Sequence, residues 1–109
     1  MTKTIDYDEI EDILFIHEGF KPDEKFKGNI DLGNIIFDLS TNGRIVGIEI
    51  INASDFFKEF KLSVKDLKNI EQASIKSLVK KDSLIVFLAL KTNKAETRIP
   101  IAAPLAVPA

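Results

Sequence analysis

An Asn-Gly pair between two apolar stretches constrains the fold of this chain more than any other feature. Asn42-Gly43 separates residues 34–40 from residues 44–51, and both stretches are rich in Ile with Val, Leu or Phe. Asn-Gly between two such runs is the strongest short-range signal for a β-hairpin. Arg44, directly after the pair, is interpreted as charge at the hairpin tip.

The register of this hairpin decides which side chains share a face. A two-residue loop is favoured because it places six apolar residues on one face, with Leu39 opposite Val46, Phe37 opposite Ile48 and Ile35 opposite Ile50. The other face then carries Asp38 and Glu49 together with Ile36 and Ile45. A three-residue loop that closes with Gly43 as a bulge shifts the pairing by one residue, and the local sequence is compatible with both loops.

Further strands are predicted wherever apolar residues alternate or run together. They cover residues 4–7, 12–18, 25–31, 71–80, 84–90 and 96–101. Residues 84–90 are all apolar, which is typical of a central strand. Pro100 places the last strand at the edge of a sheet, because proline has no backbone N–H to donate.

Two short helices are predicted after the hairpin, where the apolar period changes from two to about 3.6. The first covers residues 52–60, with Asn52 or Ser54 as its N-cap. The second begins at Ser63, which forms a capping box with Asp66, and ends near residue 70.

These elements predict an α+β fold with a mostly antiparallel β-meander sheet of about seven strands and one or two short helices between residues 52 and 70. At 109 residues the chain is expected to form a single domain, residues 1–109. Its parts are a hairpin half (4–55), a half with a helix and a β-meander (56–101) and an apolar, proline-containing tail (102–109).

Composition and charge narrow the classes of function. The chain is 45% apolar and 29% charged, and it contains no Cys, which excludes disulfides and thiolate zinc sites. The first residues form no apolar run of signal-peptide length, so a cytoplasmic location without membrane contact is expected. The net charge of −2 argues against nucleic-acid binding. The one feature that would favour such binding is a basic stripe at helical spacing: Lys58, Lys61, Lys65 and Lys68.

Candidate chemistry is sparse. Asp8 and Asp12 in an acidic turn, with His17 nearby, are the weak candidates for a metal site, because hard cations prefer several oxygen ligands from one turn. The turn lacks the glycine and the bidentate glutamate of a calcium loop, and ordinary solvated surface explains it equally well. No catalytic or cofactor-binding residue is predicted, and no cofactor is expected.

Part of the chain resembles a known family. The residues of this chain that carry the resemblance are Asp12-Ile-Leu-Phe-Ile16, Gly33-Asn-Ile-Ile-Phe-Asp38 and Gly43-Arg-Ile-Val-Gly-Ile-Glu-Ile50, followed by Asn52-Ala-Ser54. Over roughly residues 4–55 the chain is similar to the small prokaryotic proteins called domain of unknown function 2283. The resemblance implies a compact β-rich domain and no established activity, so it transfers no functional residues.

The preferred functional hypothesis is a non-enzymatic protein-interaction domain that forms a homodimer. Its basis is an excess of apolar surface, since Ile36 and Ile45 oppose the main apolar face and the strand over 84–90 has two apolar faces. The expected interface comprises Ile36, Ile45, Leu105 and Val107. One alternative is an antitoxin-like protein that neutralises the product of an adjacent gene. Another is a metal- or carboxylate-dependent enzyme built on Asp12, His17, Asp38 and Glu49.

Overall fold

The structure, a computed structural model, describes residues 3–104, which form eight strands and two helices. The strands are β1 (Thr4–Asp8), β2 (Ile13–His17), β3 (Phe26–Asp31), β4 (Ile35–Ser40), β5 (Ile45–Ile51), β6 (Gln72–Val79), β7 (Ser83–Lys91) and β8 (Glu96–Pro104). The helices are α1 (Ala53–Lys58) and α2 (Val64–Leu67). The predicted class, mostly antiparallel β structure with short helices between residues 52 and 70, is confirmed.

The strands are divided between two antiparallel sheets, so the expected single meander of about seven strands is wrong. The larger sheet has five strands in the order β1-β2-β5-β4-β3, and the smaller has three in the order β6-β7-β8. Meander order holds only locally, for β3-β4-β5 and for β6-β7-β8. In the larger sheet, β2 pairs with β5 and not with β3, the next strand along the chain. The connection over residues 18–25 carries the chain past β5 and β4, so that β3 lies at the far edge of the sheet.

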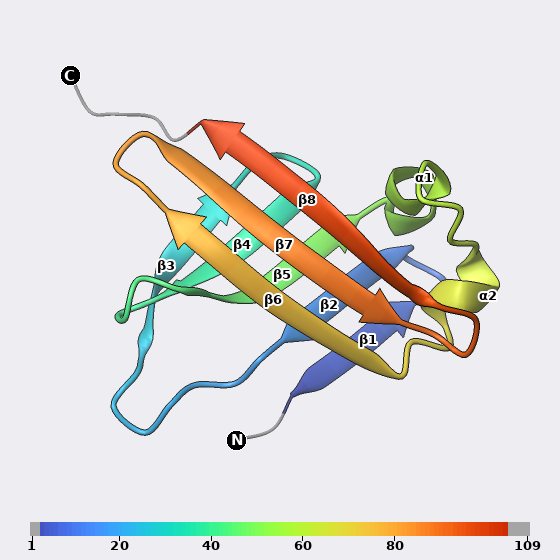
Figure 1. Cartoon of the computed structure of the whole chain (residues 1–109), viewed down its shortest axis with the longest axis horizontal. Coiled ribbons are helices and arrows are strands. Elements are labelled where there is room, and N and C mark those ends of the chain that lie inside the picture. Colours follow the sequence, from blue (N-terminus) through green and yellow to red (C-terminus); the bar gives the residue numbers. More distant parts are fainter. Residues whose placement is uncertain (1–2, 105–109) are drawn as a thin grey trace.

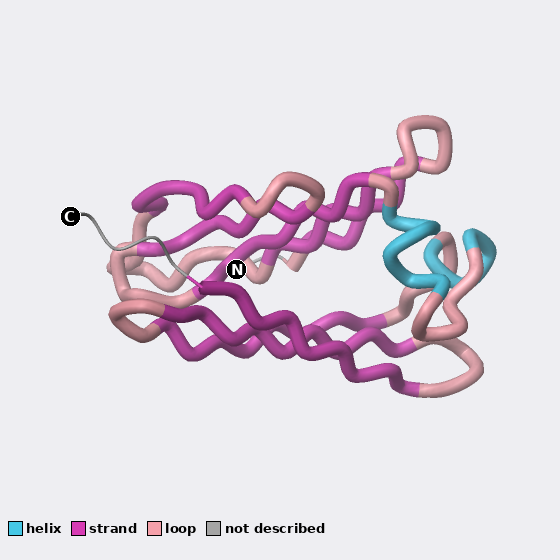
Figure 2. The backbone as a smooth tube through the Cα atoms, turned by 90° about the horizontal axis from the view of Figure 1, so that it is seen from above, coloured by secondary structure: helices cyan, strands magenta, loops and turns pink. Residues whose placement is uncertain are grey.

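The two sheets pack as two layers whose strands run across one another (Figures 1 and 2). Each sheet directs alternate side chains inward, as a pleated strand must. The shared core contains Leu14, Ile16, Phe37, Ile48 and Ile50 from the larger sheet, and Ile75, Leu84, Val86, Leu88, Leu90 and Ile99 from the smaller. Each sheet therefore has one face toward the core and one face toward the outside.

The β4–β5 hairpin closes with the three-residue loop, so the favoured two-residue loop is wrong. At its tip, Ser40 N donates to Arg44 O (3.0 Å) around a three-residue loop, and Gly43 has a φ of +77°. A β-bulge then restores the favoured register, so that Phe37 pairs with Ile48 as predicted. Above the bulge the prediction is wrong, because Leu39 pairs with Ile45.

The helices lie together at one end of the two layers (Figure 2). The predicted capping box of α2 is confirmed, because Ser63 and Asp66 bond to each other's backbone N–H groups. At α1 the predicted cap is wrong: Asn52 has a left-handed backbone and its side chain makes no cap hydrogen bond. The cap is Asp12, which accepts hydrogen bonds from Ser54 N (3.0 Å) and Ser54 Oγ (2.6 Å). No helix within residues 3–104 is long and apolar enough to cross a membrane.

Candidate interaction surface

The outer face of the smaller sheet carries an apolar surface that no other part of residues 3–104 covers. Along β7, Leu84, Val86, Leu88 and Leu90 point into the core, so Ile85, Phe87 and Ala89 point outward. The register sets Ile85 between Leu78 of β6 and Ala102 of β8, and it sets Phe87 between Lys76 and Pro100.

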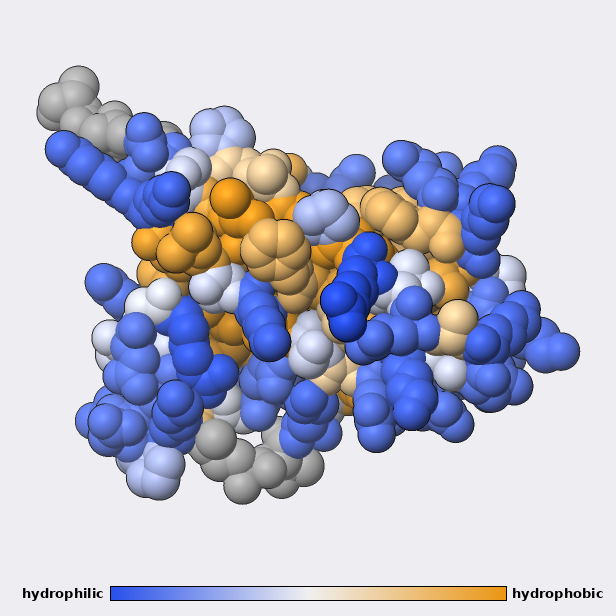
Figure 3. Space-filling model, in the orientation of Figure 1, coloured by the Kyte–Doolittle hydropathy of each residue, from blue (hydrophilic) through white to orange (hydrophobic). Residues whose placement is uncertain are grey.

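We call Leu78, Ile85, Phe87, Pro100 and Ala102 the apolar patch. Leu78 and Phe87 are 50% and 53% exposed, respectively. The space-filling view shows apolar surface spread over this face, with polar side chains around it (Figure 3). A strand face that meets only water ordinarily carries polar side chains, so this apolar face needs a different explanation.

The outer face is hollowed on both sides of Phe87. One hollow of about 320 Å³ is lined by Phe87 and Ala89 together with Ser74, Lys76, Glu96 and Arg98. Another, of about 400 Å³, lies at the end of the sheet against Ile85, Ala102 and Pro104. Neither contains a cluster of buried polar groups of the kind that orients a small-molecule substrate.

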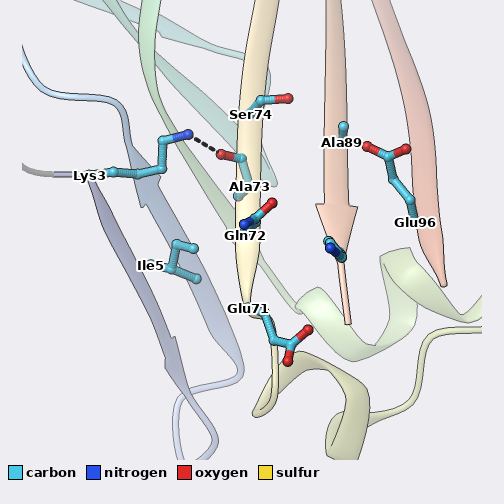
Figure 4. Close-up of a pocket in the computed structure, with 9 residues that line it drawn as sticks. Lys3, Ile5, Glu71, Gln72, Ala73, Ser74, Ala89 and Glu96 are labelled. Atoms are coloured by element: carbon cyan, nitrogen blue, oxygen red, sulfur yellow. Dashed lines mark hydrogen bonds between the residues drawn. The ribbon is translucent and has the colours of Figure 1, made fainter. Parts of the chain in front are cut away.

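A third hollow, of about 410 Å³, lies where the edges of β1 and β6 meet (Figure 4). Lys3, just before β1, and Ile5 of β1 line one side of it, and residues 71–74 at the start of β6 line the other. It continues onto the outer face of the smaller sheet, where Ala89, Lys91 and Glu96 line it. The Lys3 ammonium donates to Ala73 O, and Glu18 Oε1 accepts from Ile75 N (2.6 Å). These side chains occupy outward backbone groups of β6, so this edge is poorly suited to pairing with another strand.

The free edge of β8 is interrupted in another way. Thr92 N donates to Ala95 O (3.1 Å) at the β7–β8 turn. Because hydrogen-bonded pairs alternate along an antiparallel ladder, the backbone of every second residue from Glu96 to Pro104 faces outward. Pro100 and Pro104 belong to this outward set and have no N–H. Both edges of the smaller sheet are therefore protected, and its outer face is left as the accessible apolar surface.

The predicted metal candidates do not converge. Asp8 Oδ1 accepts from Ile10 N and Glu11 N (both 3.0 Å) and closes the β1–β2 turn. Asp12 caps α1 and also accepts from the Tyr7 hydroxyl (2.6 Å). Burial on its own would raise the pKa of Asp12, but the hydrogen bonds from Ser54 and Tyr7 outweigh it and lower that pKa. Within residues 3–104 no group of three or more His, Asp or Glu side chains is arranged to hold a metal ion.

His17 lies on the outer face of the larger sheet, in one row with Gly47 and Asp38. Its Nδ1 accepts from Gly19 N (2.9 Å), and its ring packs edge-on against Phe20. Glu49 lies on the same face in the next row. The structure thus brings together three of the four residues of the enzyme hypothesis, on an open sheet face, while Asp12 is engaged at α1.

The residues predicted for the interface are distributed differently. Ile36 lies half-buried on the outer face of the larger sheet, between Asp31 and Glu49. Ile45 is only 1% exposed and belongs to the core, because the β-bulge turns it to the inner face. Its predicted place on the outer face is wrong. Leu105 and Val107 lie outside the described residues.

The predicted basic stripe is not one continuous helix face. Lys58 ends α1, Lys61 has a φ of +60° between the helices, and Lys65 belongs to α2. Lys68 forms an ion pair with Glu9 (2.8 Å). The four lysines therefore belong to separate short segments, which weakens the case for a helix that contacts phosphates.

The sequence contained a signal for the apolar patch that the prediction used only in part. The two apolar faces of residues 84–90 were recognised, and they correctly indicated an uncovered surface. Leu78 was the missed signal, since it stands in phase with Gln72, Ser74 and Lys76 on the polar face of its strand. Pairing of Leu78 with Ile85 could not be derived without the register.

Comparison with known proteins identifies the family. The family model described as "Protein of unknown function (DUF2283)" matches residues 4–54. A Methanosarcina mazei protein named "Putative hypoxanthine phosphoribosyltransferase" is 32% identical over 89 residues, which cover 82% of this chain and 68% of that protein. An uncharacterized protein of Methanocaldococcus jannaschii is 36% identical over 90 residues, which cover 83% of this chain and 73% of that protein. The chain belongs to the DUF2283 family. No solved structure matches it significantly.

The DUF2283 match coincides with one layer of the fold. Residues 4–54 comprise the five strands of the larger sheet and the start of α1. The apolar patch lies on β6, β7 and β8, beyond the matched residues. The family itself has no assigned function, so the role of the smaller sheet has to be argued from its own surface.

Proposed function

We propose that this DUF2283 protein is a non-enzymatic protein-interaction domain that self-associates through the outer face of its smaller sheet. The observation that carries the proposal is the exposure of Phe87 and Leu78 at the centre and edge of a continuous apolar patch. Contiguous exposed apolar patches of more than a few hundred Å², rimmed by polar side chains, are typical of interaction sites.

Burial of the apolar patch against a second copy is more favourable than its exposure to water. Burying one Phe or Leu side chain is worth about 1.5–3 kcal/mol, and the patch contains three large apolar side chains in contiguous rows. The protected edges of β6 and β8 disfavour growth by strand addition. Packing of one outer face on another buries the patch without requiring any new backbone hydrogen bond.

A matched pair of phenylalanines provides the test. Phe87 and Phe26 are 53% and 52% exposed, but Phe26 lies at the start of β3 in the other sheet. Phe87→Ser should raise the Kd of the dimer about tenfold or more, because each copy loses the burial of one aromatic ring. Phe26→Ser should leave the Kd unchanged. Light scattering after size exclusion, over a dilution series, measures both; equal dimerisation of all three proteins, or none in the wild type, would contradict the proposal.

The printed name of the Methanosarcina mazei relative suggests a competing activity. A phosphoribosyltransferase must bind phosphate groups, and helix N-termini with free backbone N–H groups are common phosphate sites. In the described part of this chain, Asp12 occupies the start of α1 and the Ser63–Asp66 box occupies the start of α2. We therefore expect no heat on titration with hypoxanthine or with a phosphoribosyl donor. Saturable binding of either compound would favour the enzyme over the interaction domain.

A further inference from the structure

We infer that the second copy packs face to face on the smaller sheet, with the two-fold axis of the dimer parallel to β7. This inference rests on the proposed self-association and adds the arrangement of the partner. Three observations lead to it: the polarity gradient along the sheet, the register of its three strands and the size of the face.

The outer face changes from apolar to polar along the strands. Leu78, Ile85 and Ala102 form one row near the β6–β7 turn, whereas Gln72, Lys91 and Glu96 form the row at the other end. A two-fold axis parallel to the strands preserves the position of each row and places apolar on apolar. An axis perpendicular to the strands reverses one copy and brings Ile85 toward the polar end of the partner. Burial of apolar surface therefore selects the parallel axis.

The register then determines which side chains meet. Rotation about β7 places β6 of one copy over the partner's β8. Row by row, Leu78 meets the partner's Ala102, Lys76 meets the partner's Pro100, Ser74 meets the partner's Arg98, and Gln72 meets the partner's Glu96. None of these four pairs joins like charges, whereas the rotation does set Lys91 of β7 opposite the partner's Lys91. The two Lys91 side chains approach at the axis, where the two Glu96 carboxylates flank them.

A two-fold interface requires that one surface be its own complement. After rotation, the charged Glu96 and Arg98 of β8 lie opposite the uncharged Gln72 and Ser74 of the partner's β6. The central strand contributes Ile85 and Phe87 to both sides at once. A different protein would need to present this same sequence of apolar and polar rows.

The size of the face predicts a modest affinity. Three strands at about 4.8 Å spacing and nine residues at about 3.3 Å rise give a face of roughly 14 by 30 Å. A standard interface buries about 800 Å² per partner, so this face, at roughly 420 Å², supplies about half of that area and falls in the class of weak, transient interfaces.

Single cysteines test the arrangement, because the chain has no cysteine of its own. Sheets pack about 10 Å apart, so a bifunctional maleimide of about that span can join residues that face each other. Ile85→Cys should cross-link with itself at least about tenfold more than Asp6→Cys, whose side chain lies on the larger sheet. Leu78→Cys should cross-link with Ala102→Cys in a mixture, and neither should do so alone.

The outcomes separate the two proposals. A wild-type protein that is monomeric at every concentration contradicts self-association itself. If the wild type is dimeric and Ile85→Cys cross-links with Ala89→Cys but not with itself, then only the parallel axis is contradicted. A dimeric wild type in which Asp6→Cys gives the main product contradicts the choice of sheet. Cross-linking of either the Ile85 variant with itself or the Leu78–Ala102 mixture supports the arrangement, so the test does not depend on one variant folding.

Discussion

Arg44 holds the buried carboxylate of Glu24 with two hydrogen bonds, from Nε to Oε2 (2.7 Å) and from Nη2 to Oε1 (2.6 Å). Glu24 also accepts from the Ser40 hydroxyl (2.6 Å), and Arg44 donates to Gly19 O (3.0 Å). The pair fixes the loop before β3 to the tip of the β4–β5 hairpin. The interpretation of Arg44 as charge at the hairpin tip was therefore incomplete, because its partner lies far away in the sequence.

Removing the charge of Glu24 should destabilise the fold strongly. In Glu24→Gln the Arg44 guanidinium loses its partner inside a largely buried site, which costs about 3 kcal/mol or more in comparable pairs. Urea unfolding followed by circular dichroism measures this change. The control is Glu11→Gln at an exposed carboxylate, which should shift the free energy of unfolding by less than about 0.5 kcal/mol. Equal effects of the two variants would show that the ion pair is not structural.

The same pair predicts how stability depends on pH. Hydrogen bonds from Arg44, which outweigh the opposing effect of burial, lower the pKa of Glu24 from 4.5 to about 2. Since the folded pKa lies below the unfolded pKa, this contribution is complete above pH 4.5 and is lost as the pH falls toward 2. The difference in unfolding free energy between wild type and Glu24→Gln should therefore shrink over this window. A constant difference across the window would contradict the assignment.

Tyr7 offers a spectroscopic test of the site at Asp12. Burial, followed by the hydrogen bond to Asp12, raises the pKa of Tyr7 from 10.0 to about 12. Tyr7 is the only tyrosine and the chain has no tryptophan, so phenolate absorbance reports on it alone. We expect titration near pH 12, and a lower midpoint in Asp12→Asn, which removes the negative charge. An unchanged midpoint in that variant would mean that Asp12 does not act on the phenol.

Gly47 lies so close to two neighbouring side chains that a Cβ there would displace them. A Cβ at this position would lie 2.6 Å from Asp38 Oδ2 and 2.9 Å from His17 Cδ2. Gly47→Ala should therefore displace the ends of these two side chains and destabilise the fold by about 1 kcal/mol. The control is Gly28→Ala, where a Cβ meets no atom within 4 Å. Thermal unfolding compares the two variants, and the His17 ring signals in NMR should shift only in Gly47→Ala. Similar stability of both would contradict close packing over Gly47.

Local signals in the sequence predicted most of the elements. Asn42-Gly43 specified a hairpin, Ser63 and Asp66 specified the start of α2, and the all-apolar run over 84–90 specified a central strand with two apolar faces. Each of these depends on residues within a few positions of one another, where spacing alone decides the geometry. Division of the strands between two sheets depends on distant pairings, such as β2 with β5, which periodicity does not report.

The candidate site was predicted less well for the same reason. Ile45 was assigned to the outside because a single β-bulge, invisible in the pattern, reverses the face of the residues beyond it. The patch around Phe87 requires Leu78, Ile85 and Pro100 to be neighbours on three strands, which only the register establishes. Asp12 was considered as a metal ligand, whereas its partner Ser54 is 42 residues away along the chain.

Sedimentation equilibrium of the unmodified chain tests the central claim most directly. If the apolar patch packs against a second copy, the weight-average mass should rise from the 12.2 kDa of one copy toward twice that value as concentration increases. The modest size of the face predicts that this rise occurs at micromolar or higher concentration. A mass of 12.2 kDa at every concentration, up to the limit of solubility, would contradict self-association.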